Sequence, residues 1–140
     1  MMTLSDSIKI CYKKSFDPHG RASPSEFWWF QSTFFLVFLF ALTDGGGYTL
    51  RDNIDKDLIV LPYFILIVIS IPALLCVAIR RWHDLGYSGW MLLLNLLPYL
   101  GTVITFFYFM QDSEKETNLY GDIPSDSPDY VKQLDKLNKT

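Results

Sequence analysis

Residues 58–79 read LIVLPYFILIVISIPALLCVAI and contain no Asp, Glu, Lys, Arg or His. A soluble amphipathic helix of this length would carry a polar face, which this stretch lacks. An uncharged apolar stretch of about 18 residues or more is typical of a membrane span. We therefore predict a transmembrane helix over about residues 58–79.

Two further stretches without charged residues flank this helix, residues 27–42 before it and residues 90–110 after it. The remaining segments are too short to bury a core of their own, which excludes a soluble enzyme domain. We therefore predict an all-α membrane protein with three transmembrane helices, at about 24–42, 58–79 and 90–110. Together they form a predicted membrane domain over residues 23–111.

The first predicted span begins with a helix-start signal. Ser23-Pro24-Ser25-Glu26 places a Ser at the N-cap, a Pro at the first helical position and a Glu at the third. This order is typical of a capping box that also carries the proline favoured at a helix start. We predict that the helix begins within two residues of Pro24, with Ser23 as its cap.

The two ends of the chain differ in composition from the predicted membrane domain. In residues 1–22, Leu4 and Cys11 belong to an apolar series at helical spacing, with lysines toward the other face. Such a helix suits the headgroup region of a membrane, and we predict an N-terminal interfacial amphipathic helix. Residues 112–140 are polar, and we predict a disordered or loosely docked tail with a short helix at Tyr130–Leu137.

Positive charge predicts how the spans are oriented. Three spans place the N-terminal segment and the loop 80–89 on one side, and the loop 44–57 and the tail on the other. Six Lys or Arg residues lie near the membrane on the first side and three on the second, which favours a cytoplasmic N-terminus. A break at Pro98–Gly101 would instead make the third segment re-entrant and return the tail to the first side.

Two regions rich in ionisable side chains share that first side in the predicted topology. We expect these side chains to form one network, in which Glu26 and Asp84 pair with arginines and join the N-terminal segment to the loop 80–89. The arginines suit the binding of lipid headgroups or a partner, since a guanidinium matches phosphate oxygens. The favoured interpretation of the arginines themselves is that they anchor helix ends and enforce topology. The predicted site consists of Arg21, Glu26, Arg80, Arg81, His83 and Asp84.

The other residues at this interface indicate anchoring in the membrane rather than catalysis or the binding of a metal or cofactor. Neighbours such as His83 and Asp84 rarely bind a metal without a third ligand. The glycines at 45–47 lack the Lys and the helix start of a phosphate-binding loop. We therefore predict no catalytic residue, no metal and no cofactor. Four tryptophans are expected to anchor the interface as an aromatic belt, namely Trp28, Trp29, Trp82 and Trp90.

Three short motifs follow one another along the chain. Gly-Arg and Glu-Phe-Trp lie at 20–21 and 26–28, Arg-Arg-x-His-Asp-x-Gly-x-Ser-Gly-Trp lies at 80–90, and Asn-x-Tyr-Gly lies at 118–121. Over about residues 16–122, this order resembles the domain of unknown function 805 family. The resemblance implies a small bacterial inner-membrane protein, and it implies no known activity.

The sequence thus predicts an integral inner-membrane protein of unknown molecular activity, a structural or regulatory component whose cytoplasmic-side cluster contacts lipid headgroups or a partner. The predicted partners are membrane lipids, a second copy or another membrane protein, and no nucleic acid. The alternative is a subunit of a small oligomeric transporter or channel, and a membrane enzyme ranks third. No charged residue lies in mid-span, which argues against an ion pathway. The uncharged polar residues there are Ser70, Asn95, Thr102 and Thr105.

Overall fold

The computed structural model describes residues 2–45, 56–127 and 130 of the 140-residue chain. This described part is all helical, apart from one isolated bridge between Asn118 and Gly121, so the predicted all-α class is confirmed. Residues 131–137 of the predicted tail helix lie outside the described part. The elements are α1 (Leu4–Lys13), α2 (Pro24–Gly45), α3 (Lys56–Asp84), the 3₁₀ helix η1 (Gly89–Leu96) and α4 (Leu100–Phe109).

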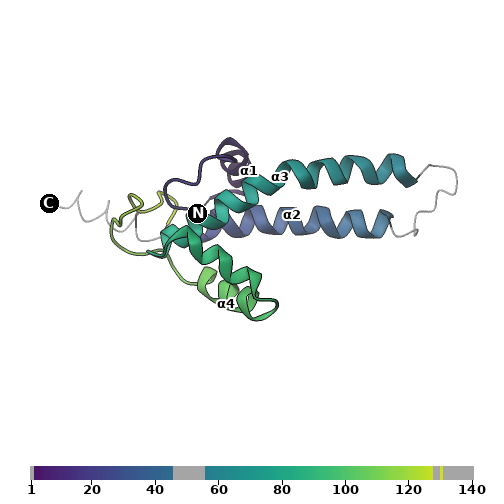
Figure 1. The fold of residues 1–140 in the computed structure, drawn as a ribbon. Coiled ribbons are helices and arrows are strands. Elements are labelled where there is room, and N and C mark those ends of the chain that lie inside the picture. Colours follow the sequence, from purple (N-terminus) through teal and green to yellow (C-terminus); the bar gives the residue numbers. More distant parts are fainter. Residues whose placement is uncertain (1, 46–55, 128–129, 131–140) are drawn as a thin grey trace.

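Helices α2 and α3 lie side by side and form the long arm of the molecule (Figure 1). The segment Leu61–Asp84 of α3 is long and apolar enough to cross a membrane, and within the described residues it is the one helix that meets this criterion. Only 17% of its most apolar stretch is buried. A core helix of a soluble protein would be covered on its apolar side, so this open surface agrees with the span predicted over 58–79.

The start of α2 follows the predicted capping signal. The helix begins at Pro24, and the backbone N–H of Glu26 donates to Ser23 Oγ at 3.1 Å. The side-chain hydroxyl of Ser23 thereby satisfies one of the backbone donors that the first turn leaves free. The prediction for this helix start is confirmed.

Helix α1 packs across one end of the α2–α3 pair, and does so through polar as well as apolar contacts. Ser7 Oγ donates to the Glu26 carbonyl at 2.6 Å, and the hydroxyls of Tyr12 and Ser70 lie 2.6 Å apart. Cys11 is fully buried beneath the helix. The predicted N-terminal helix is therefore present, and part of the face that we assigned to the membrane packs against protein.

The predicted continuous helix over 90–110 is wrong, because the chain breaks and folds back between η1 and α4. Pro98 has no N–H to continue the first helix, and Leu97 before it is extended, with ψ of 108°. Tyr99 then adopts a positive φ of 61°. Neither η1, with 8 residues, nor α4, with 10, reaches the length of about 20 residues that a span requires.

The predictions that the tail lies opposite the N-terminal segment and is disordered or loosely docked are also wrong for the part that is described. Residues 111–127 lie at the end of the molecule where α2 begins and α3 ends (Figure 1). Ser113, Ile123 and Ser127 are buried there. The fold-back after η1 brings this segment to the end of the molecule where the N-terminal segment lies. Its backbone carbonyls there accept hydrogen bonds from the buried Arg21. The polar composition of the segment does not reveal these contacts.

Candidate functional site: a buried arginine cluster and the cavity beside it

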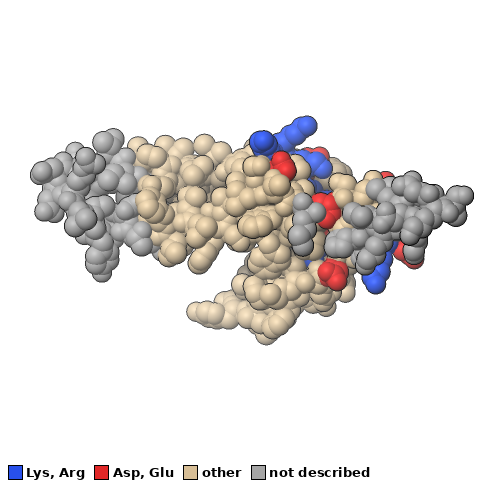
Figure 2. All heavy atoms as spheres, turned by 180° about the vertical axis from the view of Figure 1, so that it is seen from behind, with Lys and Arg blue, Asp and Glu red and all other residues tan. Residues whose placement is uncertain are grey.

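Charged side chains of the described residues gather at one end of the molecule, whereas the long apolar helices show no charge on the face drawn in Figure 2. Five of them have their side chains almost completely buried, with exposures of 6% or less. We call this group the arginine cluster, and it consists of Arg21, Glu26, Arg80, Arg81 and Asp84.

Asp84 is the centre of the larger part of the arginine cluster. Its Oδ1 accepts a hydrogen bond from Arg21 Nε at 2.9 Å, and its Oδ2 accepts from Arg81 Nη1 and from Ser113 Oγ, the latter at 2.7 Å. One carboxylate thus joins the N-terminal segment, the end of α3 and the tail. Both arginine side chains and the carboxylate are at most 1% exposed, so the charges are compensated almost without solvent.

Backbone carbonyls of the tail and of the end of α4 accept hydrogen bonds from the terminal nitrogens of these two arginines, whereas Arg81 Nε has no partner among the described residues. Arg21 donates through Nη1 to the carbonyl of Glu116 at 2.7 Å and through Nη2 to that of Glu114 at 2.6 Å. Arg81 Nη2 donates to the carbonyls of Phe109, at 3.2 Å, and of Gln111. Each guanidinium can thus fix a stretch of irregular backbone, because its donors are arranged in a rigid planar fork.

The second part of the arginine cluster is an ion pair under α1. Arg80 Nη1 lies 2.7 Å from Glu26 Oε1, and Cys11 Sγ donates to the same oxygen at 3.8 Å. Burial raises the pKa of the Cys11 thiol to about 12, and the nearby Glu26 charge acts in the same direction. The thiol therefore stays protonated and unreactive at neutral pH. The backbone N–H of Ala22 donates to the Arg80 carbonyl at 3.1 Å, which holds the two chain segments together.

The predicted pairing of Glu26 and Asp84 with arginines is confirmed, whereas His83 lies outside the ion pairs. Its Nδ1 is 3.3 Å from the Gly20 carbonyl, and its ring stacks on Tyr120 at 3.8 Å between centroids, with 2° between the planes. Asn118 Nδ2 donates to the His83 carbonyl at 2.9 Å. His83 therefore attaches the Asn-x-Tyr-Gly motif to the end of α3.

Of the four predicted interface tryptophans, Trp82 belongs to the core instead. It is fully buried, and its ring contacts those of Tyr108 and Phe109 at 5.4 and 5.0 Å. Trp82 packs against α4 because the chain folds back after η1. The prediction of one continuous helix over 90–110 did not include this contact. The other three stay at the surface or close to it: Trp29 and Trp90 are exposed, and Trp28 is half-buried.

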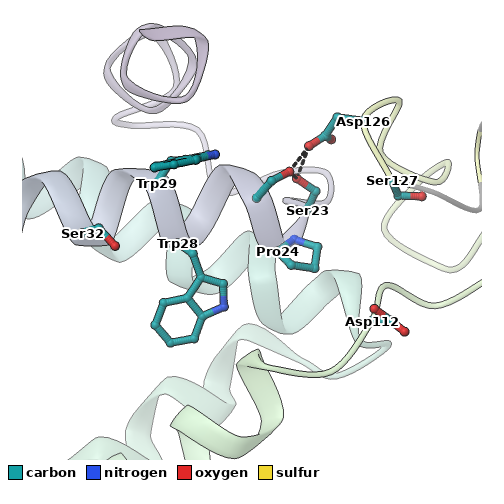
Figure 3. A pocket seen from close by; sticks show the side chains of 9 residues that line it. Ser23, Pro24, Trp28, Trp29, Ser32, Asp112, Asp126 and Ser127 are labelled. Carbon is teal, nitrogen blue, oxygen red and sulfur yellow. Dashed lines mark hydrogen bonds between the residues drawn. The ribbon is translucent and has the colours of Figure 1, made fainter. Parts of the chain in front are cut away.

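Sequence reasoning missed a cavity of 380 Å³ beside the arginine cluster, at the start of α2 (Figure 3). Asp126 Oδ2 accepts hydrogen bonds there from the hydroxyls of Ser23, at 2.6 Å, and Ser25. The tail carboxylate thus lies at the positive end of the α2 dipole. No spacing in the sequence indicated this contact, since the residues lie about a hundred positions apart. The lining residues are Ser23, Pro24, Ser25, Trp28, Trp29, Ser32, Asp112, Asp126 and Ser127.

A metal centre is not formed by the described ranges, in which no three His, Cys, Asp or Glu side chains lie close enough to hold an ion. His19 is exposed and lies 3.0 Å from Asp17, outside the arginine cluster. The chemistry that the described site offers is therefore charge pairing and hydrogen bonding, with hydroxyls and indoles around the cavity.

These features define a small all-helical protein of membrane type, with one helix long and apolar enough to cross a membrane and a buried arginine cluster at one end. Residues 15–122 match the model of the family described as Protein of unknown function (DUF805), and the chain belongs to this family. The predicted resemblance over residues 16–122 is thereby confirmed. A search of curated proteins and a search of solved structures found no match.

Proposed function

We propose that this protein is a multi-pass component of the bacterial inner membrane, with a structural or regulatory role, whose polar end contacts lipid headgroups. The observation that carries the proposal is the 380 Å³ cavity, which lies where the apolar α2 meets the charged end of the molecule. Indoles border it on the side of α2, and tail carboxylates border it on the other (Figure 3). Tryptophan at such a boundary is typical of the headgroup level of a membrane.

In this proposal α2 and α3 span the membrane, and η1 and α4 form a re-entrant hairpin. All polar segments except the loop 46–55 then face the cytoplasm. Lys115 of the tail then also lies on the cytoplasmic side. This gives seven Lys or Arg residues near the membrane on that side and two on the other side, Arg51 and Lys56. The positive-inside rule thus supports this orientation more strongly than it supports three spans.

The cavity rather than the arginines supplies the headgroup contact. The donors of Arg21 and Arg81 reach protein carbonyls and Asp84, which supports a role in holding the tail. The cavity presents the carboxylates of Asp112 and Asp126 and two indole rings. Carboxylates and indole faces both attract an ammonium group, so the chemistry favours the headgroup of phosphatidylethanolamine.

The proposed topology predicts which positions react with a membrane-impermeant maleimide. Single cysteines replace Tyr87, Leu119 or Thr49 in a chain with Cys11→Ser and Cys76→Ser; Leu119 is 98% exposed. In intact cells we expect labelling at position 49 and protection at 87 and 119, and the reverse in inverted vesicles. Labelling of 49 and 87 on opposite sides, with 119 on the side of 49, would establish three spans. Labelling of 87 and 119 from outside would establish the inverted orientation.

Removing the exposed cavity carboxylate is expected to weaken lipid retention. We expect Asp112→Asn to reduce the phosphatidylethanolamine that co-purifies in mild detergent by roughly two- to fivefold, because one partly screened charge contact is lost. Native mass spectrometry measures the bound lipid. Asp122→Asn is the matched control, since Asp122 is an exposed carboxylate of the same tail outside the cavity lining. Equal retention by both variants contradicts the proposal.

A further inference from the structure

A second cavity, of 300 Å³, lies between the long arm and the η1–α4 hairpin. Four uncharged polar side chains from three elements line it: Gln31 of α2, Asn95 of η1, and Thr102 and Thr105 of α4. Gln31 is seven residues into α2, or about 10 Å from its start at 1.5 Å per residue. In the proposed topology this depth is within the hydrocarbon region, where polar side chains are costly unless they find a partner.

Thr105 carries the strongest signal in this cavity. It is only 8% exposed, and its Oγ1 has no hydrogen-bond partner among the described residues. A helical threonine in an apolar setting ordinarily donates to the carbonyl four residues before it, and Thr105 does not. A buried hydroxyl without a partner lowers stability, so its presence at a cavity wall indicates that a ligand supplies the partner.

The rest of the lining indicates what kind of ligand fits. None of the described lining residues is charged, which disfavours a phosphate or an ammonium group. Four aromatic rings form one continuous wall, in which Phe109, Phe27, Trp28 and Phe106 pack edge to face with centroid distances of 4.7, 5.2 and 5.4 Å along the row. Such a wall suits a flat ring laid against it, and the amides and hydroxyls suit oxygen atoms on the edge of that ring.

We propose that this cavity binds the ring of a lipid-soluble quinone. The ring would lie against the aromatic wall, and its carbonyl oxygens would accept hydrogen bonds from Thr105, Thr102 and the amide of Gln31. The alkyl chain would extend along the open apolar surface of the arm. A volume of 300 Å³ is at the lower end of ordinary ligand sites and accommodates a single substituted ring. The inference rests on the proposed membrane placement, which cysteine labelling tests separately.

Titration with a decyl-substituted benzoquinone in phosphatidylcholine nanodiscs tests the site. A quinone quenches an indole that it touches, so saturable quenching of the protein fluorescence, with Trp28 at the cavity wall, reports binding. We expect Thr105→Val to weaken binding roughly five- to tenfold, the equivalent of one hydrogen bond to a carbonyl. We expect Gln31→Leu to weaken it to a similar extent.

The same variant separates ligand binding from a structural role. Without ligand, Thr105→Val is expected to melt at the same temperature as the parent or higher, because an unpartnered hydroxyl is replaced by a methyl group of the same shape. Thr33→Val is the matched control: Thr33 is on α2 outside this cavity, and its hydroxyl donates to the Trp29 carbonyl at 2.8 Å. We expect it to bind the quinone like the parent. Non-saturable quenching, unchanged affinity in Thr105→Val or a lower melting temperature of that variant without ligand would each overturn the proposal.

Discussion

Replacing Asp84 by Asn is expected to destabilise the protein by about 3–5 kcal/mol, because it leaves two buried arginines without their carboxylate. Asp84 accepts from Arg21, Arg81 and Ser113, and its side chain is fully buried. Asparagine keeps the shape and removes the charge, so the loss measures charge pairing rather than packing. Thermal unfolding in mild detergent, followed by circular dichroism, should show a midpoint lower by about 10 °C or more.

The tail should respond to this substitution before the long helices do. Arg21 and Arg81 hold tail carbonyls only while Asp84 fixes their orientation, so in Asp84→Asn we expect faster tryptic cleavage after Lys115 at temperatures where α2 and α3 remain helical. Asp122→Asn is the control, since it removes an exposed tail carboxylate and should change stability by less than about 0.5 kcal/mol. A loss below about 1 kcal/mol in Asp84→Asn would mean that the arginine cluster does not hold the fold together.

Replacing Gly101 by Ala is expected to open the hairpin between η1 and α4 at a cost of about 3 kcal/mol. A Cβ at this position would lie 1.6 Å from the Leu94 carbonyl oxygen and 2.5 Å from its carbonyl carbon. Both are backbone atoms, which cannot move aside as the end of a flexible side chain can. The two segments must therefore separate for the methyl group to fit.

Spin labels at the exposed positions Leu93 and Phe107, one on each segment, measure this separation. In Gly101→Ala we expect a longer and broader distance distribution than in the parent, together with a lower unfolding temperature. Leu100→Ala is the matched control. Leu100 is next to Gly101 and is 62% exposed, so shortening its side chain leaves the contact between Gly101 and the Leu94 backbone unchanged. An unchanged distance distribution in Gly101→Ala would contradict the close approach of the two backbones.

Predictions based on short-range signals agree with the structure. Ser23 and Pro24 mark the start of α2 because a cap acts within one turn, and the capping hydrogen bond forms as expected. The pairing of Glu26 with Arg80 followed from placing two helix ends on the same side. Such inferences need only the order of the elements along the chain.

The prediction of a third span failed at the turn near Pro98, and the predictions for Trp82 and the tail failed with it. The uncharged stretch 90–110 has the length of a span, and hydropathy does not say whether Pro98 bends a helix or ends it. In the structure the helix ends, because Leu97 is extended and Tyr99 has a positive φ. Gly101 permits the fold-back, since only a residue without Cβ admits the Leu94 carbonyl. With the segment folded back, α4 covers Trp82, and the tail reaches the arginines.

The helical class, the uncharged surface of α3 and the shared end of the N-terminal segment and the Arg80–Arg81 pair follow from the amino-acid sequence alone, since hydrophobicity, caps and charge are properties of each segment. The two cavities and the backbone acceptors of the arginines depend on the three-dimensional fold, which brings the tail to the arginines. The carbonyls of Gln111, Glu114 and Glu116 accept hydrogen bonds from them. Every residue type has the same backbone carbonyl, so no sequence pattern shows which carbonyls accept these hydrogen bonds. The position of each carbonyl in the folded chain determines its partner.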